Sequence, residues 1–301
     1  MPLNPYVERI ARVTVTVQRP NAQGTASSQT YVFINNRMKI RLRDGGANFG
    51  NCRIELYGVP LADMNTVARL YLMPLTPQHT DTVNVDIWDG NTQQFVPLFQ
   101  GVVSWSAIAA SGMPHVALVI ESNSSFALMI ARASPYANGT PVSLQDVLTA
   151  IATPVGYTVD YSTAAPQYMI QRVRLTGSPM DQINALMRSF PDLTFNVHLQ
   201  RLIVRPANAP YSSSVGAVAI SAATGMQAAP EYGTNGVTFS TLFNAQIVPG
   251  ASLAFTTQFA YLNQTQWVAS VLQHDLEPNV FAGKWTSSIA ACAYGVTGNT
   301  Q

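Results

Sequence analysis

Charged residues are scarce in this sequence. Only 10 % of the 301 residues are Asp, Glu, Lys or Arg, whereas an average soluble protein has about 25 %. The 16 basic and 15 acidic residues leave a net charge of +1, which argues against a protein whose main task is to grip nucleic acid or an acidic membrane. Because 47 % of the residues are hydrophobic, the chain can bury a core and is not disordered.

A surface with so little charge must be covered by Ser, Thr, Asn and Gln. Such a surface repels its own copies weakly and is easily desolvated, so it suits a subunit that is packed against others. An ordinary neutral β-protein has a similar composition. Composition therefore leaves an assembly protein and an ordinary β-protein both open.

Cysteine is nearly absent too. Cys52 and Cys292 lie far apart, each in an apolar alternating context, which favours two small buried hydrophobic residues over a disulfide. The four histidines are scattered singly and lack the spacing of metal ligands. The first residues show neither the basic nor the apolar region of a signal peptide, so folding in a reducing cytoplasm is expected.

Long hydrophobic runs are missing as well. Residues 232–274 contain no Asp, Glu, Lys or Arg, but they are interrupted by Asn, Gln and Pro249. A helix facing lipid would not carry these residues and would need about 20 consecutive apolar positions. The segment is expected to form several short strands with neutral polar outer faces.

What is present is the alternation of polar and apolar residues that is typical of strands. It is clearest in residues 37–43, where apolar residues alternate with basic ones. The basic residues are Arg37, Lys39, Arg41 and Arg43. Asp44-Gly45-Gly46 then turns the chain into a returning strand at 52–57, which predicts a hairpin with Cys52 and the following alternate residues facing inward.

Further strands are predicted along the first part of the chain, with one short helical turn at 63–69. The strands cover 7–18, 82–88, 95–106, 114–121 and 126–132. Each is bounded by Gly, Pro, Asn or Ser. Residues 1–132 are therefore expected to form a β-barrel or sandwich.

The pattern changes in the middle of the chain. Ser143 and Asp146 predict the start of a helix that Pro154 ends, and Ser178-Pro179 with Asp181 repeats the arrangement. A strand is predicted after each helix, at 157–161 and 193–198, and two more fit 170–175 and 201–205. A duplicated helix–strand unit is thus expected over about 135–207.

Beyond this unit the chain returns to strands. They are predicted at 216–221, 236–242, 251–258, 266–273 and 284–292. The fold class is therefore expected to be α+β and mostly β. Three domains are predicted: an N-terminal β-barrel at 1–132, an α+β domain with an internal repeat at 133–207, and a C-terminal β-barrel at 208–301.

Patterns that carry catalysis are not found. The sequence has no glycine-rich phosphate loop before a helix, no Gly-x-Ser-x-Gly turn and no His-Glu-x-x-His motif. A glycosidase pair among Asp86, Asp89 and Glu121 stays open, although Asp89-Gly90 is explained more simply by a hairpin turn. His274 and Asp275 are adjacent on an expected strand and so point to opposite faces, which prevents a base–carboxylate pair. No catalytic, cofactor-binding or metal-binding residue is predicted.

Other candidate residues have structural explanations. Asp181 and Asp192 flank the second helix as cap and turn residues. The four tryptophans lie in segments that resemble strands and are expected to anchor a core or an interface. They are Trp88, Trp105, Trp267 and Trp285. A carbohydrate-binding role would need at least two of them exposed together.

The stripe of Arg37, Lys39, Arg41 and Arg43 is the one electrostatic feature above background. One interpretation is a solvated strand face, partly neutralised by Glu55 on the neighbouring strand. The other is a surface that docks an acidic partner or meets DNA as it passes. So short a stretch does not hold DNA tightly at physiological salt.

Several short segments follow one another in an order and spacing that resemble the baseplate hub of Mu-like phage tails. In the first half they are Cys52–Gly58, Met64–Asn65 and Phe99–Gly101; in the second half they are Ala223–Met226, Tyr232–Gly233, Leu242–Asn244, Pro249–Gly250, Trp267–Val268, His274–Glu277 and Gly283–Ser287. These segments span most of the chain. The candidate structural residues of the motif are Phe99, Gly101, Gly225, Met226, Trp267, His274 and Trp285.

The resemblance implies two small tudor-like β-barrels bridged by α+β elements. It also implies a trimeric ring around a central channel, joining a hexameric tail tube to a trimeric spike that punctures the cell. The implied partners are the tail tube or distal tail protein, the spike, the tape-measure protein and other baseplate subunits. DNA would meet the ring only in transit, without membrane insertion. Such a hub has no chemistry or cofactor and lies in the virion tail tip after assembly in the host cytoplasm.

Two other functions stay open. A receptor- or glycan-binding tail protein would display a cluster of exposed aromatic residues. A cell-wall hydrolase would need a catalytic set, which the sequence does not display.

Overall fold

The structure is a computed structural model, and it describes most of the chain. The described residues are 9–20, 26–46, 50–68, 81–90, 92–111, 115–207, 209–211, 216–233 and 236–294. Positions 7, 8, 69 and 114 of the predicted elements lie outside them. Among the described residues, no helix combines the length and apolar character that a membrane crossing requires.

The N-terminal part is an antiparallel arrangement of strands with one short helix. Its elements are β1 (Ala11–Pro20), β2 (Ala26–Phe33), β3 (Met38–Gly45), β4 (Asn51–Tyr57), α1 (Leu61–Val67), β5 (Thr82–Asp89), β6 (Gln94–Ala109) and β7 (Ala117–Asn123). The predicted hairpin is confirmed, because β3 pairs with β4 and every second residue of both strands is buried. The helical turn is confirmed as α1.

The middle part is an α+β unit. Its elements are α2 (Phe126–Ile130), β8 (Tyr136–Ala137), β9 (Val142–Ser143), α3 (Leu144–Ala152), η2 (Thr153–Val155), β10 (Thr158–Tyr161), β11 (Met169–Ile170), β12 (Arg174–Leu175), α4 (Pro179–Met187), β13 (Leu193–His198) and β14 (Arg201–Pro206). A sheet of order β10-β14-β13 supports it. Both predicted helix starts are confirmed, since the Ser143 and Ser178 side chains accept hydrogen bonds from the amides of Asp146 and Asp181.

The C-terminal part returns to strands, as predicted. Its elements are β15 (Val218–Ser221), η3 (Ala222–Thr224), β16 (Glu231–Gly233), β17 (Gly236–Leu242), β18 (Ser252–Thr256), α5 (Ala260–Gln264), β19 (Gln266–Leu276) and β20 (Trp285–Tyr294). The uncharged segment 232–274 thus forms short strands and one short helix, as its Asn and Gln content indicated.

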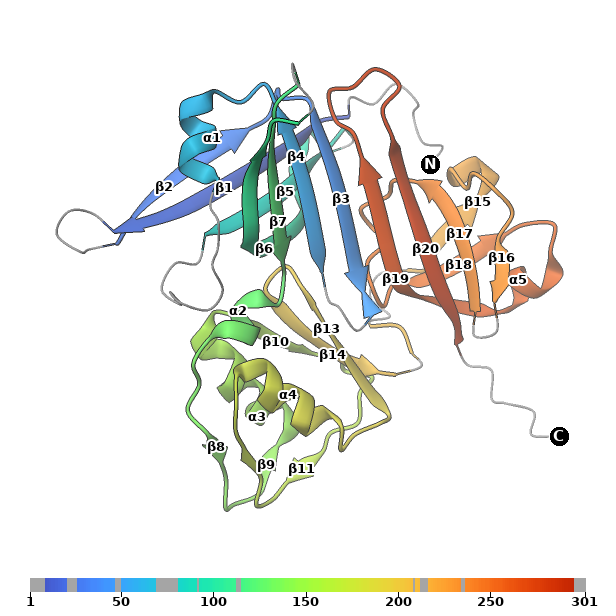
Figure 1. Cartoon of the computed structure of the whole chain (residues 1–301). Helices are drawn as coiled ribbons and strands as arrows, with labels where there is room; N and C mark the ends of the chain where they lie inside the picture. Colours follow the sequence, from blue (N-terminus) through green and yellow to red (C-terminus); the bar gives the residue numbers. More distant parts are fainter. Residues whose placement is uncertain are drawn as a thin grey trace.

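The N- and C-terminal strands share one continuous sheet. Its order is β16-β17-β20-β19-β3-β4-β7-β6-β5-β1-β2, with β18 beside β19 and β15 beside β18. The two parts meet where β19 pairs with β3, and Figure 1 shows the α+β unit below the sheet, on the side where β3 ends. The structure is mostly β, as predicted, but the two separate barrels are not confirmed, because the sheet runs across both parts.

Gly45 makes the contact between β3 and β19 close. It has a φ of 83°, and a Cβ built on it would lie 2.2 Å from the carbonyl oxygen of Ser270. Glycine adopts a positive φ readily and has no Cβ, so it meets both requirements of this position. The turn residue that the sequence indicated therefore also permits the junction between the two β parts.

Three clusters of buried side chains form the interior. One lies among β1–β7, one within the α+β unit and one among β15–β20. Phe243 and Leu276, from the C-terminal part, belong to the first cluster. The two β parts are thus joined by apolar packing as well as by strand pairing.

Three local predictions are wrong. The strand expected at 126–132 is the helix α2: Phe-Ala-Leu-Met-Ile lacks alternation and contains good helix formers, and the Asn123 side chain accepts from the Ser125 amide just before it. The strand expected at 170–175 is divided between β11 and β12. Cys52 is buried, but Cys292 is exposed, because Ile289 and Ala291 are the residues of β20 that face inward.

Candidate functional site

The outer surface of strands β19, β3, β4 and β7 concentrates charge, and we call it the charged face. Because β3 alternates, its Lys39, Arg41 and Arg43 are exposed while the residues between them are buried. The face holds ten of the 31 charged residues of the chain (16 basic, 15 acidic). They are Arg37, Lys39, Arg41, Arg43, Arg53, Glu55, Glu121, Asp275, Glu277 and Lys284.

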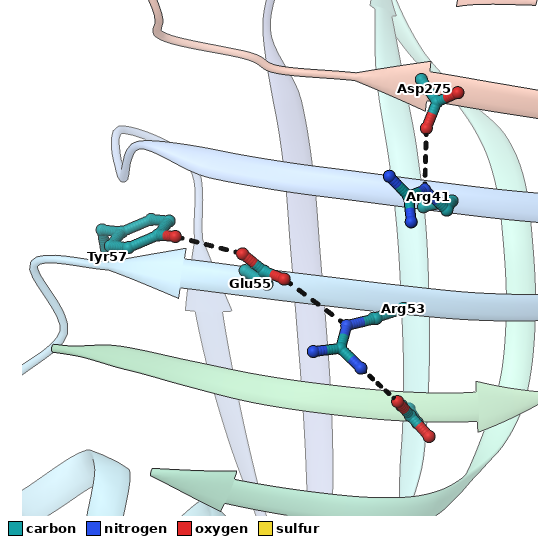
Figure 2. Close-up of polar contacts among 6 residues, drawn as sticks. Arg41, Arg53, Glu55, Tyr57 and Asp275 are labelled. Atoms are coloured by element: carbon teal, nitrogen blue, oxygen red, sulfur yellow. Dashed lines mark hydrogen bonds and ion pairs between the residues drawn. The ribbon is translucent and has the colours of Figure 1, made fainter. Parts of the chain in front are cut away.

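A row of ion pairs crosses the charged face (Figure 2). Asp275 is opposite Arg41, Arg41 is opposite Arg53, and Arg53 is opposite Glu121 in the registers of the four strands. The Arg41 Nε donates to Asp275 Oδ1 at 2.9 Å, and the Arg53 Nη1 donates to Glu121 Oε1 at 2.7 Å. As exposed pairs, they contribute at most about 1 kcal/mol each.

Two carboxylates of the charged face, those of Glu55 and Asp275, are each held by two side chains. Tyr57 donates its hydroxyl to Glu55 Oε2 at 3.1 Å, and Arg53 reaches Glu55 Oε1 at 3.4 Å. Burial opposes the ionisation of Asp275, but hydrogen bonds from Arg41 and Gln273 outweigh it and hold its pKa below the ordinary value. Of the four stripe residues, Arg41 is therefore neutralised by Asp275, whereas Glu55, the neighbour that the sequence suggested, contacts Arg53 and Tyr57 in the described part of the chain.

The remaining basic residues of the stripe, Arg37, Lys39 and Arg43, form fewer contacts. The Arg37 guanidinium lies 5.1 Å from the centre of the Tyr57 ring. Within the described part of the chain, no ion pair or hydrogen bond involves the side chain of Lys39 or Arg43. Lys39 lines a shallow pocket of about 170 Å³ together with Arg41, Glu277 and others. The face can therefore still attract an acidic group.

The carboxylates that could have formed a catalytic pair each have a local role. Asp86 forms an ion pair with Arg12 at 2.8 Å, and Glu121 forms one with Arg53. Asp89 accepts from the Thr92 hydroxyl in the β5–β6 turn, as its hairpin interpretation predicted. The structure does not bring the three together through any described contact.

His274 and Asp275 point to opposite faces, as predicted. His274 is 2 % exposed, and its Nδ1 lies 2.7 Å from the Ser287 hydroxyl. Burial lowers its pKa to about 4, so the ring is neutral near pH 7. Asp275 faces outward and pairs with Arg41. His274 and Asp275 therefore do not pair with each other.

The other candidate motif residues lie in cores or at turns. Phe99 and Trp267 are buried, and the Trp267 Nε1 donates to the Leu262 carbonyl. Trp285 packs its ring 5.6 Å from that of Phe243, next to His274. Gly225 ends η3 with a φ of 102°, and Met226 follows it in a β-bridge to Thr241.

Gly101 lies in a place with no room for a side chain. A Cβ built on it would lie 2.6 Å from the Phe99 ring and 2.9 Å from the Asn123 carbonyl oxygen. The remaining tryptophans fit an anchoring role, since Trp88 packs edge-to-face on Phe95 and Trp105 is half-buried.

A junction between the α+β unit and the main sheet was missed in the sequence. His198, at the end of β13, places its Nδ1 2.9 Å from Oδ2 of Asp44, which is 4 % exposed. The Ser124 hydroxyl accepts from the Gly50 amide and donates to the Val197 carbonyl beside this pair. Asp44 continues the inward-facing alternation of β3, and that signal could have revealed its burial.

An exposed aromatic cluster was missed too. Tyr232, Phe259 and Tyr261 are 54 %, 36 % and 54 % exposed. The Tyr232 ring centre lies 6.5 Å from that of Phe259 and 6.4 Å from that of Tyr261, with interplanar angles of 90° and 44°. No tryptophan is among them, which is why attention to the tryptophans did not find the cluster.

Metal chemistry finds no support in the residues that the structure describes: none of them form a group of three or more His, Cys, Asp or Glu side chains able to hold an ion.

Two solved structures have a similar fold. One is the 43 kDa tail protein of prophage MuSo2 from Shewanella oneidensis, with 10 % identity, a TM-score of 0.57, and 93 % of this chain and 96 % of that chain covered. The other is the tail protein from Neisseria meningitidis MC58, with 11 % identity, a TM-score of 0.58, and 95 % of this chain and 96 % of that chain covered. At such low identity the likeness concerns the fold. No curated protein matches the chain.

The sequence also matches a family model. Residues 51–279, more than half of the chain, match the model described as Baseplate hub gp41. The match contains the whole aromatic cluster, His198 of the junction and five residues of the charged face. Asp44 and the basic residues 37–43 lie before it, and Lys284 lies after it. Together with the shared tail-protein fold, the match confirms the resemblance seen in the sequence: the chain belongs to the baseplate hub gp41 family.

Proposed function

We propose that this chain is a structural subunit of a phage tail tip that forms a trimeric ring between a hexameric tail tube and a trimeric spike. The observation that carries the proposal is the continuous sheet, in which β3 and β19 join the two β parts into one wall. A subunit with two rigidly joined β parts can present two contacts to a six-fold tube in each of three copies.

The domain division 1–132, 133–207 and 208–301 is part of this proposal. The three buried clusters support three units, although Leu128, which this division assigns to the first domain, packs into the cluster of the α+β unit. In this proposal β1–β7 and β15–β20 take the places of the two tudor-like barrels. Phe243 and Leu276 keep them from moving independently, because both residues pack into the N-terminal cluster.

The charged face is proposed to stay in contact with water and to line the channel. The cores of protein interfaces are depleted of charge, so a face that holds ten of 31 charged residues is the least suited to be covered. Its four carboxylates weaken any grip on DNA, which suits DNA in transit. Docking of an acidic partner segment at Lys39 and Arg43 is the alternative role for this face.

The partners follow from the ring. They are the tail tube or distal tail protein, the spike, the tape-measure protein and other baseplate subunits. The chain has no chemistry of its own in this account, and it reaches the virion tail tip after assembly in the host cytoplasm. It is not inserted in a membrane.

Native mass measurement tests the ring directly. We expect the purified chain to form a trimer, alone or when tube and spike proteins are added, and to bind both of them. A stable monomer that binds neither would contradict the proposed function.

A glycan-binding role is favoured by one observation, the cluster of Tyr232, Phe259 and Tyr261. Against it, rings at 90° and 44° to one another do not make one flat platform for a sugar ring. Binding of the chain to host cells or to their isolated glycans would support this alternative. For the hydrolase alternative, a zymogram on host peptidoglycan is expected to show no cleared zone.

A further inference from the structure

Three strands of the main sheet pair with a single described strand each: β2 with β1, β16 with β17 and β15 with β18. Of the three, only β2 and β16, which lie at the two ends of the main strand order, carry an exposed large hydrophobic residue, Val32 and Tyr232. Figure 1 shows α1 and β2 at one side of the molecule and α5 and β16 at the opposite side. Each end therefore presents a strand edge that no described strand covers.

The first end, which we call the β2 end, consists of Ala26–Phe33. The sequence ASSQTYVF contains no charged residue and no Pro, and its register with β1 is unbroken. Proteins usually protect a long edge strand with charge, Pro or a bulge. Val32 is 55 % exposed here. The β2 end thus has the properties of a strand that another chain covers.

The second end, the aromatic end, consists of Tyr232 on β16 with Phe259 and Tyr261 around α5. The Tyr261 ring packs edge-to-face on Trp267, at 6.0 Å between centres, and Trp267 is 1 % exposed. A buried ring therefore holds the exposed rings in place. Fixed Tyr and Phe rings bury a large area with little loss of side-chain freedom, which is typical of the residues that dominate interfaces.

We propose that the aromatic end of one copy of this chain binds the β2 end of the next copy, head to tail. Both ends are poor in charge: β2 carries none, and the exposed Glu231 is the one charged residue of β16, since residues 232–274 carry none. A single carboxylate gives a strongly charged partner little to bind, whereas each end offers the other an apolar surface and a strand edge. A contact between two different patches closes into a ring when its rotation allows.

This inference rests on the proposed function, because a ring of three needs three such contacts. It adds which surfaces form them. In the closed ring the edges of β2 and β16 are covered, while the charged face of β19, β3, β4 and β7 lies between the two contacts and stays free.

Single substitutions at each end test the contact. Val32→Lys at the β2 end, and Tyr232→Lys or Tyr261→Lys at the aromatic end, place a charge in the proposed interface. We expect each to raise the concentration needed for trimer formation at least about tenfold. Met169→Lys is the matched control, because Met169 is 66 % exposed but lies on β11 in the α+β unit. Circular dichroism checks that every variant is folded. Tyr232→Lys serves where Tyr261→Lys, next to Trp267, fails that check.

A mixture of two variants distinguishes a head-to-tail contact from a symmetric one. The Val32→Lys variant has an unaltered aromatic end, and the Tyr232→Lys variant has an unaltered β2 end. When the two are mixed at concentrations well above those at which the wild type assembles, the only contact between two unaltered ends joins one copy of each variant. We expect native mass spectrometry to detect a 1:1 dimer that grows no further.

Three outcomes would overturn the inference: unchanged trimers in the variants at both ends, a mixture that remains monomeric, or a mixture that forms complete trimers. If these occur while the wild type is a trimer, the proposed function stands and only the assignment of surfaces fails. If the wild type itself does not trimerise, alone or with tube and spike proteins, the proposed function and the inference fail together.

Discussion

At the scale of residues, a largely buried polar pair, Asp44 and His198, connects the main sheet to the α+β unit. Asp44 looked like a turn residue in the sequence, yet its carboxylate binds His198 from a hairpin 154 residues away. No local pattern contains that information, because the partner is set by how the α+β unit docks. The opposite orientations of His274 and Asp275 were predictable, since they follow from strand geometry alone.

Loss of the Asp44 carboxylate should loosen this junction. Asp44→Ala leaves the His198 ring and the Gly45 amide without their acceptor in a buried place. We expect the free energy of unfolding in urea to fall by about 2–4 kcal/mol. Glu121→Ala removes the exposed pair with Arg53 and should cost less than about 1 kcal/mol. Equal losses in the two variants would show that the Asp44 pair has no special role.

His274 should make stability depend on acidity. Its folded pKa of about 4 lies below the ordinary 6.5, so at pH values between these limits the unfolded chain binds a proton that the folded chain does not. Stability is therefore complete above about pH 6.5 and falls as the pH drops towards 4, by roughly 3 kcal/mol in all.

A variant isolates this contribution from those of the other titratable groups. His274→Asn should lower stability at pH 7 but show a smaller loss than the wild type between pH 6.5 and 4. The measurement is urea unfolding at a series of pH values. An identical slope in both proteins would mean that His274 is not the group responsible.

At the scale of elements, regular sequence patterns predicted the secondary structure correctly and irregular patterns did not. Alternation in β3 and β4 and the serine caps of α3 and α4 predicted those elements correctly. Residues 126–130 were wrongly predicted to be a strand, because a short apolar run is compatible with a strand and with a buried helix. The pattern did not reveal that Leu128 packs into the cluster of the α+β unit.

The cap of α4 offers a test at this scale. Ser178 and Asp181 exchange hydrogen bonds across the first turn, and the bonds from Ser178 lower the pKa of Asp181. Ser178→Ala should reduce the free energy of unfolding by about 1 kcal/mol. Ser189→Ala, at an exposed serine just beyond the same helix, should have little effect. Thermal unfolding followed by circular dichroism measures both, and a Ser178 variant as stable as the wild type would contradict the cap.

At the scale of the whole molecule, the continuous sheet could not be derived from local pattern. β3 and β19 are more than 200 residues apart, and both have the alternation of ordinary paired strands. The scarcity of charge did indicate an assembly protein. The structure adds where the charge lies: ten of the 31 charged residues are on one face, whereas edge strand β2 has no charged residue and edge strand β16 has one, Glu231.

The most direct test of the central claim is to locate this chain in an intact tail. A small label fused to the chain can be imaged by electron microscopy of assembled particles. The account predicts three labels arranged around the tail axis, between the end of the tube and the spike. Labels on a peripheral fibre, or a copy number that is not three, would contradict it.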